Sequence, residues 1–338
     1  MKDKLTLVDD MKRIVNQRGS KASEIAKQEI LSKFASSDDV SRALKHFAEV
    51  TFRGALPVFP ALVSISCEAV GGEPDKTNSI GGAITLMAGA ADLHDDVIDE
   101  SPVKNGRQTV FGKFGKDVAI LAGDALLAWG LNRLQKACES LPREQGPRIL
   151  DLITQAILEI SQAEALERKL RAGKHLSMKA CMEVINLKSI VPEVNMKIGV
   201  VLGNGNNNMV ETLGHYGRVF GIVSTVAEEF MDVIEREELQ NRLRNDYPPL
   251  PFLCALQKPK IKALTLSNKD KALTEKELEE IKDLVLNCPG ANKLKKDMRI
   301  LAQTETKSIL AAISNKRAQM ELQTLLASTV ELLEDIDG

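Results

Sequence analysis

Residues 80–99 read Ile-Gly-Gly-Ala-Ile-Thr-Leu-Met-Ala-Gly-Ala-Ala-Asp-Leu-His-Asp-Asp-Val-Ile-Asp, an apolar segment that finishes in carboxylates. Its length and its content of alanine, leucine and isoleucine predict a buried helix. Ser101-Pro102 predict the end of this helix, because proline disfavours helical backbone in the residue before it. A buried helix needs further helices or a sheet around it, so the flanking sequence decides the fold class.

Helical patterns flank this segment along most of the chain. Ser37-Asp-Asp predicts a helix start, because the side chains of serine and aspartate cap helix N-termini. Further segments that read as helices are 61–70, 117–138, 149–170, 178–202 and 210–238, and 275–335 reads as a helical hairpin broken at Cys288-Pro-Gly, with a capping box at Thr274–Glu277. Only 4% of the residues are aromatic, which favours helix packing over a β-sandwich. The sequence therefore predicts an all-α helical bundle that forms one domain over residues 1–338.

The carboxylates at the end of the 80–99 segment predict a metal site. Asp95 and Asp99 are four residues apart, so on a helix they lie on the same face. They repel each other unless a cation lies between them, and oxygen ligands of this kind suit Mg²⁺. A solvated acidic helix end is the alternative, although acids at a helix C-terminus oppose the helix dipole. From these residues alone, the two interpretations stay about equal.

A second acidic patch follows a long uncharged stretch, 219–227. It consists of Glu228, Glu229 and Asp232, and Glu228 and Asp232 share a helix face by the same spacing. Two acidic helix ends that face each other in one bundle would clamp a diphosphate through several Mg²⁺ ions. The start of a charged, solvated segment is the alternative, and it is stronger here than at the first patch.

Composition excludes several classes of protein. The formal net charge is −2 and charges of both signs are interspersed, so we expect no nucleic-acid binding. The five cysteines are scattered without CxxC spacing, which indicates neither a zinc site nor a disulfide framework. The N-terminus lacks the apolar stretch of a signal peptide and no long uncharged apolar run occurs, so we expect a cytoplasmic protein without a membrane span.

Three motifs, taken in order, resemble the trans-isoprenyl diphosphate synthases, also called polyprenyl synthetases. They are Asp95-Asp-Val-Ile-Asp-Glu-Ser, Gly106-Arg-Gln-Thr-Val-Phe-Gly-Lys-Phe-Gly and Ala119-Ile-Leu-Ala-Gly-Asp-Ala-Leu-Leu. The resemblance is strongest over about 57–256. It implies a helical bundle of the isoprenoid synthase type, a homodimer or a heterodimer with a related synthase, and a Mg²⁺-dependent prenyltransferase of isoprenoid biosynthesis. In this family an allylic prenyl diphosphate is ionised, and isopentenyl diphosphate (IPP) attacks the carbocation.

The resemblance assigns roles to particular residues of this chain. It implies that Lys104 and Lys188 bind the allylic diphosphate, with Lys188 also catalytic. The family's prenyl pocket floor falls on Ala90 and Ala91, whose small side chains leave room for a long chain. The catalytic and metal-binding acids of the first motif are Asp95, Asp96 and Asp99, and the second metal-binding motif falls on Glu228, Glu229 and Asp232.

The chain departs from the family pattern where the family binds the diphosphate of IPP. Positions that are Lys, Arg or His in the family are here Leu56, Pro57, Phe59, Ala88 and Asn105, and a later family Lys is Tyr247. Arg53 and Arg107 lie near these positions in the sequence and are candidate substitutes. A hydrogen bond to a charged group contributes roughly 1.5–3 kcal/mol, so losing several would weaken IPP binding by orders of magnitude.

Three hypotheses follow from these departures. The chain is a prenyltransferase that passes the prenyl group to an acceptor other than IPP. Alternatively, it is an ordinary geranyl, farnesyl or geranylgeranyl diphosphate chain elongation enzyme with a rearranged IPP site. The third possibility is a non-catalytic, prenyl-diphosphate-binding subunit of a heteromeric synthase. The sequence does not give the acceptor or the product length.

Overall fold

A computed structural model describes residues 2–52, 54–104, 106–172, 176–245, 247–256, 258–261 and 273–336. Almost all of this chain is helical, which confirms the predicted all-α class. The helices are α1 (Lys2–Lys33), α2 (Asp39–Thr51), α3 (Val58–Ala69), η1 (Pro74–Thr77), α4 (Asn78–Ile98), α5 (Val110–Phe114), α6 (Lys116–Glu139), α7 (Gln145–Arg171), α8 (Met178–Lys188), α9 (Ile190–Leu202), α10 (Asn207–Ile234), α11 (Arg236–Asn245), α12 (Leu250–Ala255), α14 (Glu275–Leu286), α15 (Pro289–Ala311) and α16 (Lys316–Asp335).

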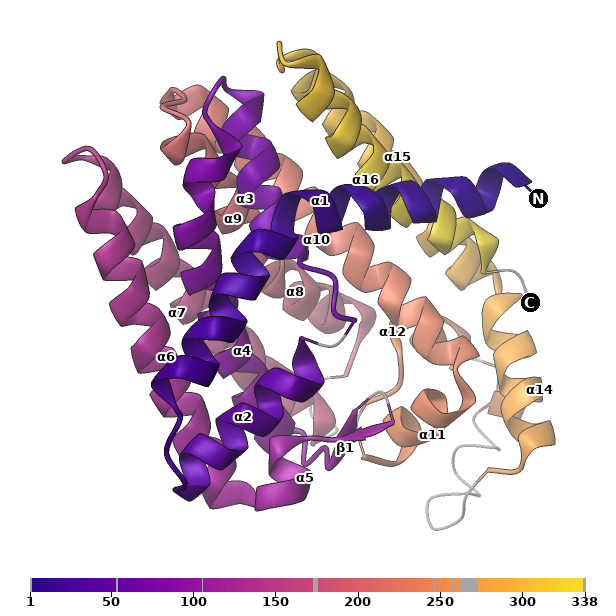
Figure 1. The fold of residues 1–338 in the computed structure, drawn as a ribbon. Helices are drawn as coiled ribbons and strands as arrows, with labels where there is room; N and C mark the ends of the chain where they lie inside the picture. The colour runs from indigo at the N-terminus through magenta and orange to yellow at the C-terminus, as the bar shows by residue number, and fades with distance from the viewer. Residues whose placement is uncertain are drawn as a thin grey trace.

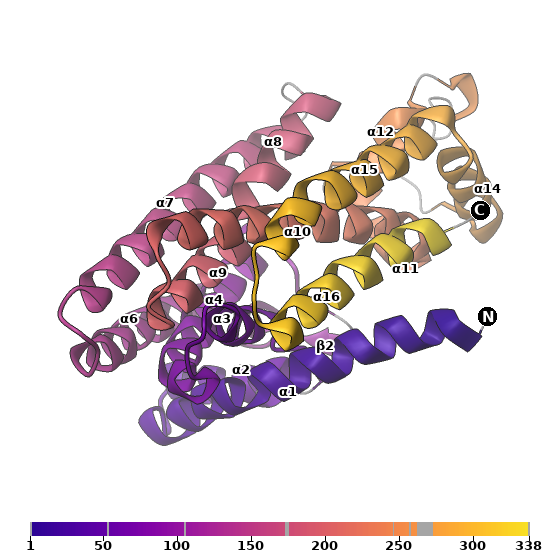
Figure 2. The same cartoon turned by 90° about the horizontal axis from the view of Figure 1, so that it is seen from above.

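The helices enclose two hydrophobic clusters. The larger cluster lies among α3, α9 and α10 and extends to α7, α12, α14, α15 and α16, whereas the smaller lies among α1, α2, α4 and α6. The long helix α1 runs across α3 and α4 and also contacts α16, so the first and last helices lie side by side (Figures 1 and 2). The two acidic patches lie at the C-terminal ends of α4 and α10.

Helix starts follow the polar side chains in the sequence. Asp38 caps α2 by accepting a hydrogen bond from the Ser41 backbone N–H at 2.9 Å. Thr274 and Glu277 form the predicted capping box at the start of α14, so this prediction is confirmed.

The segment predicted as one helix over 178–202 is two helices, which corrects that prediction. The break lies at Ser189, between α8 and α9. Proline has no N–H, so Pro192 cannot bond to the carbonyl of Lys188 four residues earlier. Gly217 and Gly221 of α10 pack against this break, since a Cβ at Gly217 would lie 2.5 Å from the Pro192 carbonyl oxygen. The break makes Lys188 the last residue of α8.

Other boundaries also differ from the prediction. The helix predicted over 210–238 ends at Ile234, and a separate helix, α11, begins at Arg236. The segment 275–335 forms three helices instead of a hairpin of two. The 32-residue α1 was not predicted as an element, because its apolar residues are sparse. The described residues contain one antiparallel pair of strands, β1 (Val103–Lys104) and β2 (Arg107–Gln108). The sequence Asn105-Gly106 is a hairpin-turn signal, and Gly106 has the positive φ of 70° that such turns require.

A buried group of charges ties α1 to α3 and α16. The Arg18 guanidinium contacts the carboxylates of Glu68 and Glu321, with 2.8 Å between Arg18 Nε and Glu321 Oε2. Only 5% of the Arg18 side chain is exposed. Because the three residues come from helices at both ends of the chain, this group fixes how α1 and α16 pack.

We expect Arg18→Ala to lower the free energy of unfolding by about 3 kcal/mol, because it removes the cation that Glu68 contacts and leaves Glu321 with Arg317 alone, at 3.1 Å. Arg13→Ala is the matched control on the same helix, since the Arg13 side chain is 61% exposed and pairs with exposed Asp10. Its expected loss is below about 1 kcal/mol. Urea denaturation measures both variants. Equal losses would show that the buried group does not stabilise the fold.

None of the helices in the described ranges combines the length and apolarity that a membrane crossing requires.

Candidate functional site

The first acidic patch occupies the last turn of α4. Asp95 and Asp96 lie in this turn, and Asp99 is the residue that ends the helix. His94, beside them in the sequence, lies 3.2 Å from Asp124 of α6 and thus ties the two helices together. The carboxylates of the patch lie opposite α7 and α8, which bring cations and further acids toward them.

The carboxylates of this patch are hard to ionise together. Burial, followed by the charges of Asp99 and Glu164, raises the pKa of Asp95 to about 7. Burial and the neighbouring Asp92 raise the pKa of Asp96 to about 7. Among the described residues, no basic side chain forms an ion pair with Asp95. A cation at this patch would therefore stabilise the charged form of Asp95.

Lys104 reaches the patch from the β1–β2 hairpin. Its Nζ lies 2.6 Å from Asp92 Oδ1 and 3.8 Å from Asp96 Oδ1. Burial alone would lower the pKa of Lys104, but the carboxylates of Asp92 and Asp96 outweigh it and raise the pKa. Lys104 is therefore a positive charge beside the first acidic patch, and its binding of the allylic diphosphate stays a prediction.

Lys188 points from the end of α8 toward α7. It contacts Glu167 and lies 2.9 Å from Glu164. Burial opposes its charge, but the two glutamates outweigh burial and raise the pKa of Lys188. Neither glutamate was predicted from the sequence as a site residue. Their three-residue spacing on the 149–170 helix, one turn apart, was the available signal.

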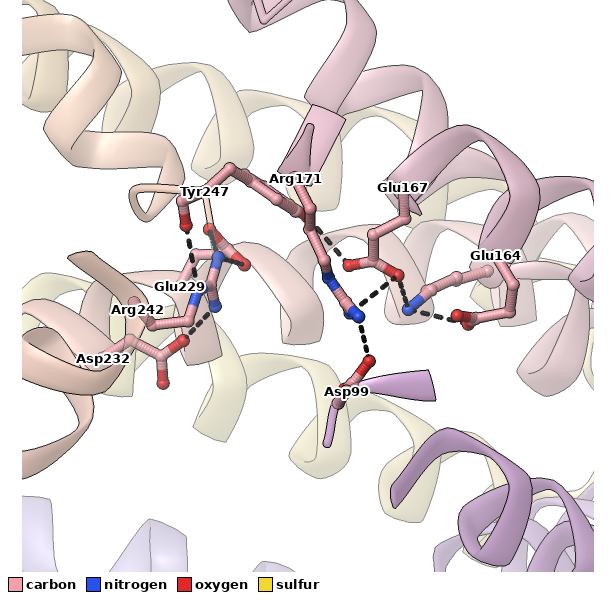
Figure 3. Close-up of polar contacts among 9 residues, drawn as sticks. Asp99, Glu164, Glu167, Arg171, Glu229, Asp232, Arg242 and Tyr247 are labelled. Carbon is pink, nitrogen blue, oxygen red and sulfur yellow. Dashed lines mark hydrogen bonds and ion pairs between the residues drawn. The ribbon is translucent and has the colours of Figure 1, made fainter. Parts of the chain in front are cut away.

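Arg171 joins α7 to the first acidic patch. Its guanidinium contacts the Asp99 carboxylate and lies 4.0 Å from Glu167 Oε2 (Figure 3). Burial would raise the pKa of Glu167, but Lys188, Arg171 and a hydrogen bond from Tyr247 lower it. Glu167 is thus an anionic centre that holds two cations and a tyrosine.

The second acidic patch lies at the end of α10 and faces Arg242 of α11. The guanidinium lies 3.0 Å from Glu229 Oε1 and 2.5 Å from Asp232 Oδ2. Glu228 is exposed. Burial raises the pKa of Asp232 to about 7, because Arg242 only partly offsets burial and the nearby glutamates. Arg242 was not predicted from the sequence as a site residue, because the stretch around it is polar and rich in arginine and glutamate.

Tyr247 connects the two halves of the site. Its hydroxyl donates a hydrogen bond to Glu167 Oε1 at 2.9 Å, and its carbonyl oxygen accepts one from Arg242 Nε at 3.2 Å. A chain of polar contacts therefore runs from Asp99 through Glu167 and Tyr247 to Arg242 and the second patch (Figure 3).

The remaining predicted residues lie apart from these contacts. Arg107 lies on β2, and its Nη1 donates a hydrogen bond to the Val50 carbonyl oxygen at 3.2 Å. Ala90 is buried in the smaller hydrophobic cluster, whereas its neighbour Ala91 is exposed. Arg53 and Asn105 lie outside the described residues. Leu56 and Phe59, at positions predicted to lack the family's cations, pack against the larger hydrophobic cluster.

The first patch has the donor chemistry that Mg²⁺ requires. Within the described part of the chain, no three acidic, histidine or cysteine side chains are close enough to enclose a metal ion. Mg²⁺ does not need such a cage, because it is held by one or two carboxylates together with waters and substrate phosphates. Asp95 and Asp99, four residues apart on one helix face, fit this mode.

Solved structures of prenyl diphosphate synthases share this fold. The geranylgeranyl pyrophosphate synthetase of Pyrococcus horikoshii aligns with a TM-score of 0.80 at 20% identity, over 95% of this chain and 98% of that one. The polyprenyl synthase of Caulobacter crescentus, complexed with calcium and isoprenyl diphosphate, aligns with a TM-score of 0.80 at 19% identity, over 96% and 97%. These similarities place the chain in the all-α isoprenoid synthase fold.

The chain belongs to the polyprenyl synthetase family, whose model matches residues 41–285. It is 26% identical to the short chain isoprenyl diphosphate synthase of Methanothermobacter thermautotrophicus over 64% of this chain and 66% of that protein. It is 22% identical to the geranylgeranyl diphosphate synthase of Saccharolobus solfataricus over 87% and 95%. The aligned stretch thus spans just under two thirds of the first relative. The family resemblance is confirmed, and the family is one of prenyltransferases.

Proposed function

We propose that this protein is a Mg²⁺-dependent prenyltransferase that ionises an allylic prenyl diphosphate and transfers the prenyl group to an acceptor other than IPP. The observation that carries the proposal is an asymmetry. The acids and Lys104 for the allylic diphosphate lie together at the end of α4, whereas Leu56 and Phe59, where the family resemblance places cations for IPP, are partly buried and pack against the larger hydrophobic cluster. Cationic groups around a leaving pyrophosphate are the main source of catalysis in such a reaction.

Each residue of the first patch has a role in this proposal. Asp95, Asp96 and Asp99 would hold Mg²⁺, which supplies positive charge to the leaving pyrophosphate when bound. Lys104 donates to a phosphate oxygen from the hairpin. Lys188 turns from Glu164 and Glu167 to the pyrophosphate. Its positive charge then stabilises the negative charge that develops on the pyrophosphate as the carbon–oxygen bond breaks.

The test is to incubate the pure protein with Mg²⁺ and radiolabelled allylic diphosphates of different lengths, with and without IPP, and to separate the products. We expect Mg²⁺-dependent release of pyrophosphate, with water trapping the carbocation as a prenyl alcohol, and no lengthening by IPP. Efficient formation of a longer prenyl diphosphate would contradict the proposal and establish chain elongation, the activity named for the relatives. Arg107 would then be the candidate ligand for IPP.

Binding without turnover would instead favour a non-catalytic subunit. Two observations support this second candidate: Lys188 is already held by two glutamates, and Arg242 lies within the second acidic patch. One relative, 28% identical over 53% of this chain, is the large subunit of a heterodimeric geranylgeranyl pyrophosphate synthase from Arabidopsis thaliana.

We propose a cytoplasmic protein that works as a homodimer or pairs with a related synthase. Exposed leucines on neighbouring helices support such an interface: Leu121 and Leu131 on α6 and Leu158 on α7. Sedimentation of the protein alone tests the homodimer, and a monomer under these conditions would contradict it.

The small residues near the end of α4 predict a chain-length effect. If Ala91 lines the prenyl pocket, Ala91→Phe fills it and shifts the binding preference from C20 toward C10 diphosphates, measured by calorimetry. Ala90, the other residue of the predicted pocket floor, is buried among the helices, so Ala90→Phe is the comparison that tests packing. Its bulk should instead destabilise the fold by about 1–3 kcal/mol. An unchanged preference among C10, C15 and C20 in Ala91→Phe would place the pocket floor elsewhere.

A further inference from the structure

Arg242 is held in place by several partners at once. Besides Glu229 and Asp232, it donates to the Tyr247 carbonyl oxygen at 3.2 Å, and the Tyr247 ring lies 5.1 Å from its guanidinium carbon. Only 11% of its side chain is exposed. These partners fix the position and orientation of the guanidinium, which a surface arginine without such partners does not have.

Both oxygens of Glu229 are already used by groups of the chain itself. Oε1 accepts from Arg242 at 3.0 Å, and Oε2 accepts from the Leu250 backbone N–H at 2.6 Å, where α12 begins. Glu229 is buried, so water cannot replace these partners. A metal ion that took Glu229 as a ligand would bring a second positive charge against the Arg242 guanidinium.

The first acidic patch differs in this respect. Asp95 has no ion pair with any basic side chain in the described ranges, and its neighbour Asp99 contacts the guanidinium of Arg171. At the second patch, one guanidinium bridges two of the three acids. The Arg242 guanidinium therefore lies between Glu229 and Asp232, where a metal ion that used both would bind, while Asp95 of the first patch has no such cation against it.

We infer that Arg242 is a built-in cation that replaces metal at the second acidic patch, so that the protein binds Mg²⁺ at the first patch only. The diphosphate then meets metal ions on the α4 side and the Arg242 guanidinium on the α10 side. Glu229 and Asp232 position this guanidinium instead of coordinating metal. The inference rests on the proposed function only in assigning Mg²⁺ to Asp95 and Asp99.

Counting bound Mn²⁺ by electron paramagnetic resonance tests the inference on the full chain, with the metal alone as the probe. In the native protein, Asp95→Ala should remove metal binding and Asp232→Asn should leave it unchanged. Arg242→Gln should gain about one Mn²⁺ per chain, because it frees two carboxylates for a divalent ion. Adding Asp232→Asn to Arg242→Gln should remove the gained ion.

Arg236→Gln is the matched control for Arg242→Gln. Arg236 lies on the same helix but pairs with Glu275 and Glu279 at 3.2 and 3.4 Å, away from the second patch. It should gain no metal. Arg242→Lys keeps the positive charge and should also gain none.

Two results would overturn the inference: native metal binding that falls in Asp232→Asn, or no gained ion in folded Arg242→Gln. If Arg242→Gln does not fold, the comparison of the native protein with Asp232→Asn still decides, with unchanged binding in support. A native protein that binds no Mn²⁺ at Asp95 contradicts the proposed function, but an ion gained in Arg242→Gln still supports the role of Arg242.

Discussion

Asp95→Ala is expected to abolish the Mg²⁺-dependent binding of farnesyl or geranylgeranyl diphosphate. Asp95 is the carboxylate of the first patch that the described chain leaves without an ion pair, so it is the one most available to a metal ion. Removing even the residues that hold metal ligands in place costs about 10–100-fold in affinity. Losing the ligand itself should exceed that range. Isothermal titration calorimetry, with Mg²⁺ and with EDTA, measures the effect.

Asp124→Ala is the control for this measurement. Asp124 is an aspartate close to the patch in space, but it pairs with His94 on the α6 side and its side chain is 65% exposed. Its removal should leave the Mg²⁺-dependent affinity within about threefold of native, since surface pairs contribute at most ~1 kcal/mol. Tight binding of the diphosphate by the native protein in EDTA would contradict the metal assignment.

The second large effect concerns IPP. We expect the unmodified protein to condense IPP poorly or not at all, because the family resemblance places cations at positions that are Leu56 and Phe59 in this chain. An unpaired phosphate against Leu56 and Phe59 would lose its hydration without compensation. Steady-state turnover with saturating allylic diphosphate and IPP is the measurement. A kcat near the ~10 s⁻¹ typical of enzymes, with a micromolar KM for IPP, would refute this expectation.

Restoring the missing charges tests the cause of this effect. Leu56→Lys with Phe59→Arg and Asn105→Arg should raise the affinity for IPP, because one restored cation alone leaves the diphosphate under-coordinated. Arg107→Gln in the native protein is the complementary variant. If the native protein binds IPP and Arg107→Gln loses that binding, Arg107 replaces the family's ligands.

Periodicity and short polar motifs in the sequence are enough to predict most of the fold. The α4 segment and the capping box of α14 were predicted because local chemistry decides them: apolar content, proline and a Thr–Glu pair. The break at Ser189 was not predicted, although Pro192 marked it. A proline acts on the carbonyl four residues earlier, so it ends the preceding helix upstream of itself. The prediction of a single domain stays a prediction.

The candidate site was only half predictable. The acids of both patches and the two lysines are visible in sequence because they fall at helical spacing or in family motifs. Their partners are not, because Glu167, Arg171 and Arg242 lie on other helices and meet the patches only after packing. Long-range ion pairs leave no periodic signal, and one arginine in a polar stretch looks like any other.

The helix end at Lys188 is a property of the covalent chain, since it follows from a proline that lacks an N–H. No ligand or salt concentration can restore a hydrogen bond for which the donor does not exist. An incoming anion therefore competes with two glutamates for the ammonium group, but it does not have to move α8. Changing partners costs the rotation of one flexible side chain, while the backbone that aims it is organised before any substrate arrives.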